Sequence, residues 1–153
     1  MELASINLLN FLIIAPHLVP EVFQKPSVRN PIAVSLGAIT GALSRYYLSL
    51  WLANIGTGFP YATILVNLTG SFFMGLLTTL ISERVLLISP EMRLLIAVGF
   101  LGSYTTFSSY ELDTMNLWRG YTWQVAIAYW SLSSVCGFGC LYLGIIVARV
   151  VRG

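Results

Sequence analysis

Hydrophobic residues gather along this chain in four long runs that are separated by short polar stretches. The runs cover approximately residues 31–52, 61–81, 92–110 and 123–147. A helix crosses a bilayer core with about 20 mostly apolar residues, and each run is close to that length. The connecting stretches NIGTGFP, SERVLLISPE and DTMNLWRG contain the Gly, Pro and polar residues typical of turns. The pattern predicts an all-α membrane protein with four transmembrane helices, in one domain that spans residues 31–153.

Composition supports this class. Hydrophobic residues make up 57% of the chain and charged residues 9%, with a mean hydropathy of +0.81, which lies outside the usual range of soluble domains. No Ser, His and acid constellation suits nucleophilic catalysis, and the acids near the predicted membrane lie at helix ends. We therefore expect neither an enzyme nor a nucleic-acid partner.

The first thirty residues do not fit a spanning helix, because the apolar stretch is short and is interrupted by Pro16 and Pro20. A signal peptide is an alternative, but it normally starts with basic residues, whereas the only early charge here is Glu2. We interpret residues 1–30 as an interfacial or poorly ordered extension.

Lys and Arg are distributed unevenly over the two predicted membrane faces. Six lie on the face that holds both termini and the second connection, and one, Arg119, lies opposite: the six are Lys25, Arg29, Arg84, Arg93, Arg149 and Arg152. Since basic residues tend to remain in the cytoplasm, the distribution favours cytoplasmic termini.

The third run contains an unusual number of hydroxyl groups, in the stretch GFLGSYTTFSSYELD. Gly102 adds flexibility, and Ser103, Thr105, Thr106 and Ser108 can replace lost backbone hydrogen bonds. A helix can open at membrane depth only where protein or a polar cavity covers the freed groups. We predict a break here, although hydroxyls that bond back to their own helix are an alternative explanation.

Two further polar residues lie inside predicted spans. Arg45 either extends its stem toward the lipid headgroups or attracts anions into a water-filled vestibule. Asn67 either joins two helices or donates its amide hydrogens to a partly dehydrated anion. Taken alone, the residues leave both alternatives open.

Three motifs, GALSRY, FPYATILVNLTGSFFMG and GFLGSYTTFSSYE, in this order and spacing, resemble the Fluc fluoride channels, also called CrcB proteins. The resemblance covers roughly residues 31–147. It implies a passive, fluoride-selective channel that lets toxic cytoplasmic fluoride escape across the inner membrane. It also implies a multi-pass chain that forms an antiparallel, dual-topology homodimer with two pores.

The resemblance further implies roles for individual residues. Asn67 corresponds to the pore amide and Arg45 to the family's first-helix arginine, whereas Phe107 and Tyr110 correspond to two aromatic rings whose edges face the ion. Tyr110 stands where the family usually has Phe. The resemblance also implies four residues whose polar groups line or support the pore: Thr106, Ser108, Tyr129 and Ser133. On the fourth helix, Tyr129 and Ser133 are four residues apart and share one face. The same spacing continues to Gly137 and Leu141, which have no polar side chain, so the polar part of this face is short.

A structural sodium ion is implied as well, bound between two subunits by the backbone carbonyls of Gly102 and Thr105. The excess of basic residues on one face conflicts with dual topology, and an inverted, related chain is the alternative partner. A small multidrug transporter and a non-transporting scaffold remain rival functions. The first would require an acid within a helix, which the first predicted helix lacks.

Overall fold

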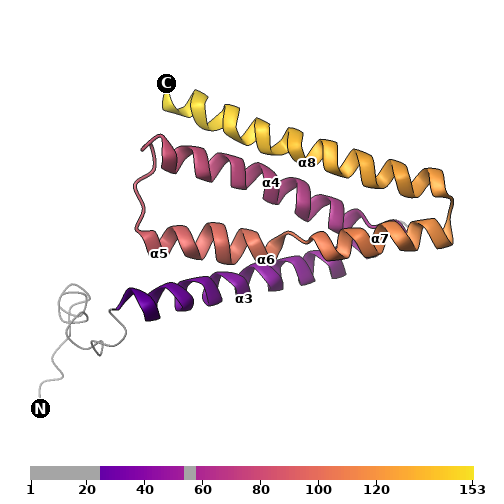
Figure 1. Ribbon diagram of the computed structural model, residues 1–153, viewed down its shortest axis with the longest axis horizontal. Coiled ribbons are helices and arrows are strands. Elements are labelled where there is room, and N and C mark those ends of the chain that lie inside the picture. The colour runs from indigo at the N-terminus through magenta and orange to yellow at the C-terminus, as the bar shows by residue number, and fades with distance from the viewer. Residues whose placement is uncertain (1–24, 54–57) are drawn as a thin grey trace, which may run out of the picture.

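The computed structural model describes residues 25–53 and 58–153, which form helices and connecting turns with no strand among them (Figure 1). The predicted all-helical class is confirmed. In chain order the elements are α3 (Pro26–Leu52), α4 (Tyr61–Ser82), α5 (Pro90–Arg93), the π-helix η1 (Leu94–Leu101), α6 (Gly102–Tyr104), α7 (Phe107–Gly120) and α8 (Trp123–Arg152). Helices α5, η1 and α6 follow one another directly, so they form the first half of the predicted third helix.

The predicted break in the third helix is confirmed. Thr105 and Thr106 both have extended backbone conformations, with φ −79° and ψ 160° at Thr105 and φ −151° and ψ 121° at Thr106. The hydroxyl of Thr106 then accepts a hydrogen bond from the backbone N–H of Ser109 at 3.2 Å, which caps the start of α7. The break is therefore a two-residue interruption with its own helix cap.

Three of the predicted boundaries are wrong. The fourth helix continues to Arg152 and does not end near residue 147. The third helix does not end near Tyr110, because the stretch DTMNLWRG is part of α7. This stretch is helical because it packs on α8, where Leu117 is buried in one cluster with Ala126 and Tyr129. The first helix begins at Pro26, five residues before the predicted start, with Pro31 inside it. Residues 1–24 of the predicted extension lie outside the described residues.

The contact between α3 and η1 depends on glycine. A Cβ at Gly37 would collide with the backbone carbonyl of Leu95, and one at Gly41 would collide with that of Phe100. Small residues allow helix backbones to approach this closely, where Cα–H groups contact carbonyl oxygens. Gly37 and Gly41 are four residues apart and thus form a GxxxG pair on the side of α3 that contacts η1.

Helices α4 and α8 pack in the same way. Gly75 of α4 lies against the carbonyl of Leu141, and Gly144 of α8 lies against the carbonyl of Phe72. The bundle thus contains two glycine-mediated helix pairs, α3 with η1 and α4 with α8. The broken third helix, which includes η1, lies between α3 and α4 (Figure 1).

Three ion pairs join helix ends at one end of the bundle. Arg29 at the start of α3 bonds to Glu91 of α5 at 2.8 Å. Arg149 and Arg152 at the end of α8 both bond to Glu83, at 3.4 and 3.1 Å. All five of these charged groups come from the segments that the charge distribution places on one membrane face, so the structure confirms that these segments share an end.

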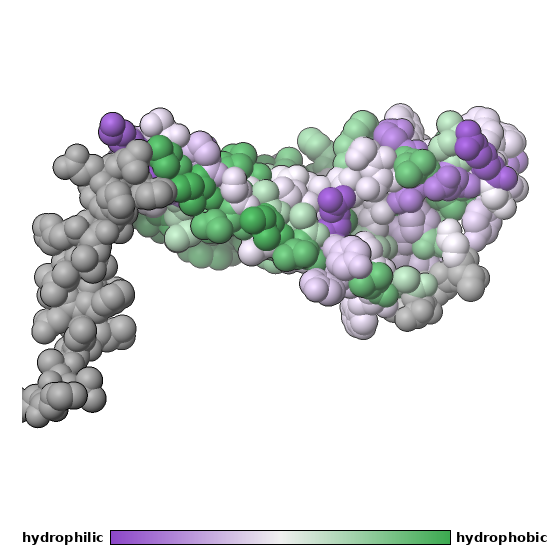
Figure 2. Space-filling model, turned by 90° about the horizontal axis from the view of Figure 1, so that it is seen from below, coloured by the Kyte–Doolittle hydropathy of each residue, from purple (hydrophilic) through white to green (hydrophobic). Residues whose placement is uncertain are grey.

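The bundle surface is largely apolar. Figure 2 shows hydrophobic side chains along much of one face, with hydrophilic ones gathered toward its right-hand end. Helices α4 and α8 are each long and apolar enough to cross a membrane. Exposed apolar side chains also run along α3: Leu36, Ile39, Leu43, Tyr47 and Trp51. A surface of this extent suits lipid or a second protein chain.

Candidate functional site

The helix break is held open by Asn67, which lies in the first half of α4. Its Oδ1 accepts a hydrogen bond from the backbone N–H of Thr106 at 2.8 Å, and its Nδ2 donates to the carbonyl of the same residue at 3.0 Å. One amide side chain thus satisfies both backbone groups at the break. The second hydrogen on Nδ2 is not used in these bonds.

This pairing frees a carbonyl one turn earlier. In a continuous helix the N–H of Thr106 would bond to the carbonyl of Gly102, but that N–H is taken by Asn67. No backbone N–H of the described residues donates to the carbonyl of Gly102 or to that of Thr105. The two carbonyls singled out from the resemblance are therefore available as oxygen ligands.

Phe107 and Tyr110 form a ring pair on the first turn of α7. Their ring centroids are 5.9 Å apart and the ring planes are inclined by 47°. Phe107 is 74% exposed in the single chain, whereas Tyr110 is only 5% exposed. The two aromatic residues predicted for the pore are thus in contact with each other, but one ring is exposed and the other is buried.

The hydroxyl of Tyr110 points into α8. It donates to the backbone carbonyl of Trp130 and lies 2.9 Å from Oγ of Ser134, which itself donates to the same carbonyl at 3.0 Å. The hydroxyl that Tyr110 has and Phe would lack thus joins α7 to α8 through hydrogen bonds. Ser134 was not singled out in the sequence, because its role depends on a residue that lies 24 positions away.

Tyr129 continues this aromatic cluster on α8. Its ring centroid lies 5.5 Å from that of Tyr110 and 5.9 Å from that of Phe59. Its hydroxyl is buried and has no hydrogen-bond partner among the described residues.

Nearby, Oγ1 of Thr63 donates to the carboxylate of Asp113 at 2.6 Å, which joins α4 to α7. This link was also missed in the sequence.

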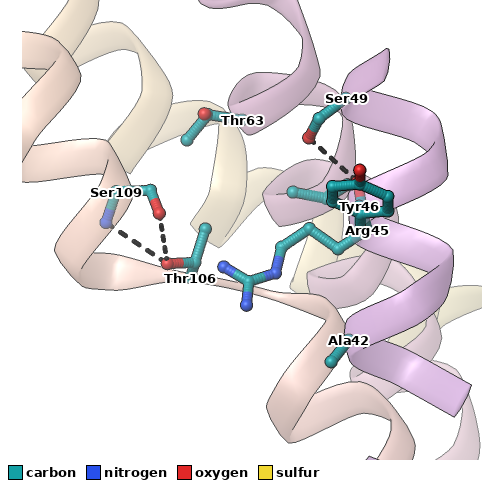
Figure 3. Close-up of a pocket in the computed structure, with 8 residues that line it drawn as sticks. Ala42, Arg45, Tyr46, Ser49, Thr63, Thr106 and Ser109 are labelled. Atoms are coloured by element: carbon teal, nitrogen blue, oxygen red, sulfur yellow. Dashed lines mark hydrogen bonds between the residues drawn. The ribbon is translucent and has the colours of Figure 1, made fainter. Parts of the chain in front are cut away.

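Three cavities lie around the break. The first, of about 290 Å³, is bordered by Arg45, Thr63, Thr106 and Ser109, and Figure 3 shows the Arg45 side chain reaching from α3 toward Thr106. Arg45 makes no ion pair with any of the described residues, so its charge is available to an anion in this cavity.

The second cavity, of about 360 Å³, is lined by Asn67, Ser71, Phe107, Tyr110, Ser133 and Ser134, together with apolar residues. Asn67 and Phe107 also line an adjoining cavity of about 270 Å³ with Thr105 and Thr106. Neither of these two cavities has a carboxylate in its lining.

Most of the residues singled out in the sequence therefore lie around the break. Ser108 does not join them, because it is exposed and lines none of these three cavities. The neighbouring Ser109 lines the Arg45 cavity instead, where its Oγ accepts a hydrogen bond from Thr106 at 3.0 Å. The polar groups around the break supply amide, hydroxyl and guanidinium hydrogens, which are donors that suit an anion.

The fold and this donor-lined break define a helical membrane protein with the features of an ion pathway. Residues 32–145 match the family model described as CrcB-like protein, Camphor Resistance (CrcB). The chain belongs to the CrcB family.

Curated relatives extend the match over nearly the whole of their own length. A protein of Trichormus variabilis named "Fluoride-specific ion channel FluC" is 55% identical over 130 residues, which cover 84% of this chain and 95% of the relative. Proteins with the same name from Synechococcus sp. and Synechocystis sp. are 54% and 48% identical. Those two alignments cover 83% and 80% of this chain, and 98% and 95% of the respective relatives.

Proposed function

We propose that this protein is a fluoride-selective channel through which cytoplasmic fluoride leaves the cell passively, which reduces fluoride toxicity. The observation that carries the proposal is the Asn67 amide at the helix break. It lines the cavity that contains Phe107, and it bonds to Thr106, which lines the cavity that contains Arg45. The names of the relatives support the same ion.

Selectivity for fluoride follows from the chemistry of these groups. Fluoride is small and strongly hydrated, so a pathway must replace its water with closely placed donors. The second amide hydrogen of Asn67, the hydroxyl of Ser133 and the positive edge of the Phe107 ring are such donors, whereas the hydroxyl of Thr106 already donates to Ser109. Arg45 would raise the local concentration of anions before they reach the narrow region. Larger chloride would fit less well and would be rejected.

Rapid, selective efflux from liposomes tests this function. We expect proteoliposomes containing the purified protein to release fluoride rapidly and chloride hardly at all, without any proton or sodium gradient. The measurement is ion release followed with fluoride- and chloride-selective electrodes, with protein-free liposomes as the control.

Other outcomes would favour the rival functions. Chloride release at a rate comparable to that of fluoride would reject a fluoride-selective channel. Flux of an organic cation coupled to protons would indicate a multidrug transporter, and absence of any flux would indicate a scaffold.

We further propose that the channel is an antiparallel homodimer in the inner membrane, in which each chain is multi-pass. The exposed Phe107 ring supports this arrangement, because an aromatic donor in a narrow pathway has to be covered on its open side. The exposed apolar face of α3 offers a surface for a second chain or for lipid.

A structural sodium ion between the subunits fits the freed carbonyls. Sodium is a hard cation that prefers oxygen ligands, and a helix interruption presents such carbonyls. The carbonyls of Gly102 and Thr105 would be half of the ligand set, and the second copy would supply the other half. Bound there, the ion would stabilise the contact between the two broken helices.

The orientation of the chain tests this assembly. A single cysteine at the end of α8, Gly153→Cys with Cys136 and Cys140 replaced, should be labelled to about half by a membrane-impermeant thiol reagent on intact cells, because an antiparallel dimer needs both orientations equally. The rest should be labelled after lysis.

Gly120→Cys in the same cysteine-free background is the matched control, since it lies at the opposite end of α8, beside the turn from α7. Both positions should label to about half in a dual-topology protein. Labelling of the two positions from opposite sides only would reject the homodimer, and the symmetric sodium site with it.

A further inference from the structure

The polar face of α8 loses a hydroxyl group at Gly137. Tyr129, Ser133 and Gly137 follow at intervals of four residues and therefore lie on one face of the helix. Tyr129 and Ser133 each carry a hydroxyl, whereas Gly137 carries no side chain. All the same, Gly137 lines the 360 Å³ cavity together with Ser133 and Asn67. Along α8, the lining of this cavity has a hydroxyl at Ser133. One turn later, at Gly137, the helix has no side-chain donor for an anion.

Ser71 of α4 lies opposite this gap. A Cβ placed on Gly137 would lie 3.9 Å from Oγ of Ser71, and no atom of another helix among the described residues would lie closer to it. The hydroxyl of Ser71 therefore borders the space that a side chain at position 137 would occupy. On its own helix, Ser71 follows Asn67 by four residues and shares its face.

The hydroxyl of Ser71 is also not used inside the bundle. Two other hydroxyls of α4, those of Thr69 and Thr78, donate to carbonyls four residues earlier, at 2.6 Å in each case. Ser71 makes no such bond and has no hydrogen-bond partner among the described residues. It lines both of the cavities that Asn67 and Phe107 line. A donor is thus available where the two cavities adjoin.

We propose that Ser71 is a further fluoride-binding residue, whose hydroxyl α4 supplies at the level where α8 has Gly137. The role rests on the proposed channel function and extends the donor series from Asn67 by one helical turn. Fluoride that has left the Asn67 amide would accept a hydrogen bond from Ser71 while it remains close to Ser133. A hydroxyl from a neighbouring helix thereby replaces the one that is missing from α8.

Moving the hydroxyl between the helices tests the role. In fluoride-loaded proteoliposomes, Ser71→Ala should slow fluoride efflux about tenfold and raise the fluoride concentration at which flux saturates, because one hydrogen bond to an anion is lost. The double variant Ser71→Ala with Gly137→Ser should recover most of the flux, since the new hydroxyl enters the same space. Ser71→Thr should also conduct, because it keeps the hydroxyl.

Ser44→Ala is the matched control, because its Oγ already donates to the carbonyl of Thr40 at 2.8 Å and lines none of these cavities. It should conduct like the unmodified protein. The role of Ser71 is rejected if Ser71→Ala conducts and saturates like Ser44→Ala, or if Gly137→Ser fails to restore a reduced flux in a protein that remains folded. Unmodified protein that releases no fluoride would instead reject the channel function itself.

Discussion

Replacing Asn67 with aspartate should reduce fluoride efflux by about a hundredfold or more. The carboxylate cannot donate to the Thr106 carbonyl, so one of the two bonds that hold the helix break is lost. It also places a negative charge where the anion has to pass, and like charges at short range in a region of low dielectric repel strongly. A loss of about 3 kcal/mol from the two effects corresponds to this factor, since about 1.4 kcal/mol changes an equilibrium constant tenfold.

Fluoride efflux from proteoliposomes measures the effect, with Asn116→Asp as the control. Asn116 lies on an exposed side of α7 and undergoes the same chemical change without contacting the break. Its variant should conduct nearly normally. If Asn67→Asp conducts as well as Asn116→Asp, then the amide only joins α4 to the broken helix and is not part of the ion pathway.

Phe107→Ile should lower fluoride efflux about tenfold or more while the protein remains folded. The ring is 74% exposed in the single chain, so its replacement by an aliphatic side chain removes few contacts within the subunit. What disappears is the positively polarised ring edge, which isoleucine cannot supply at similar bulk. A loss of about 1.4 kcal/mol of interaction with the ion accounts for the tenfold change.

Efflux should be measured together with thermal unfolding in detergent, so that loss of function is separated from loss of structure. Phe73→Ile serves as the control, since Phe73 is another largely exposed phenylalanine, at 51%, and lines neither of the cavities around Asn67. Normal efflux through the Phe107 variant would show that this ring covers apolar surface and does not face the ion.

Local features of the sequence were sufficient to predict the helices and the break. Hydrophobic runs of membrane-spanning length specify helices without reference to their neighbours, because backbone groups in an apolar solvent must bond within the helix. The cluster of Gly and hydroxyl residues at positions 102–108 likewise marks a place where a helix is weak. The helical course of residues 113–120 was missed, because that segment is rich in polar residues and its helix is stabilised by the packing of Leu117 on α8.

The candidate site required the tertiary structure. Asn67 and Thr106 are 39 residues apart, and no pattern within either segment indicates that one amide satisfies both backbone groups of the other residue. The same holds for the Tyr110 hydroxyl, whose direction is set by the Trp130 carbonyl on a neighbouring helix. Sequence alone thus determined which polar residues enter the membrane region. Only the packing of α4 and α8 against the broken helix decided which of them bond to each other and which keep free donors, because a hydrogen bond depends on positions in space.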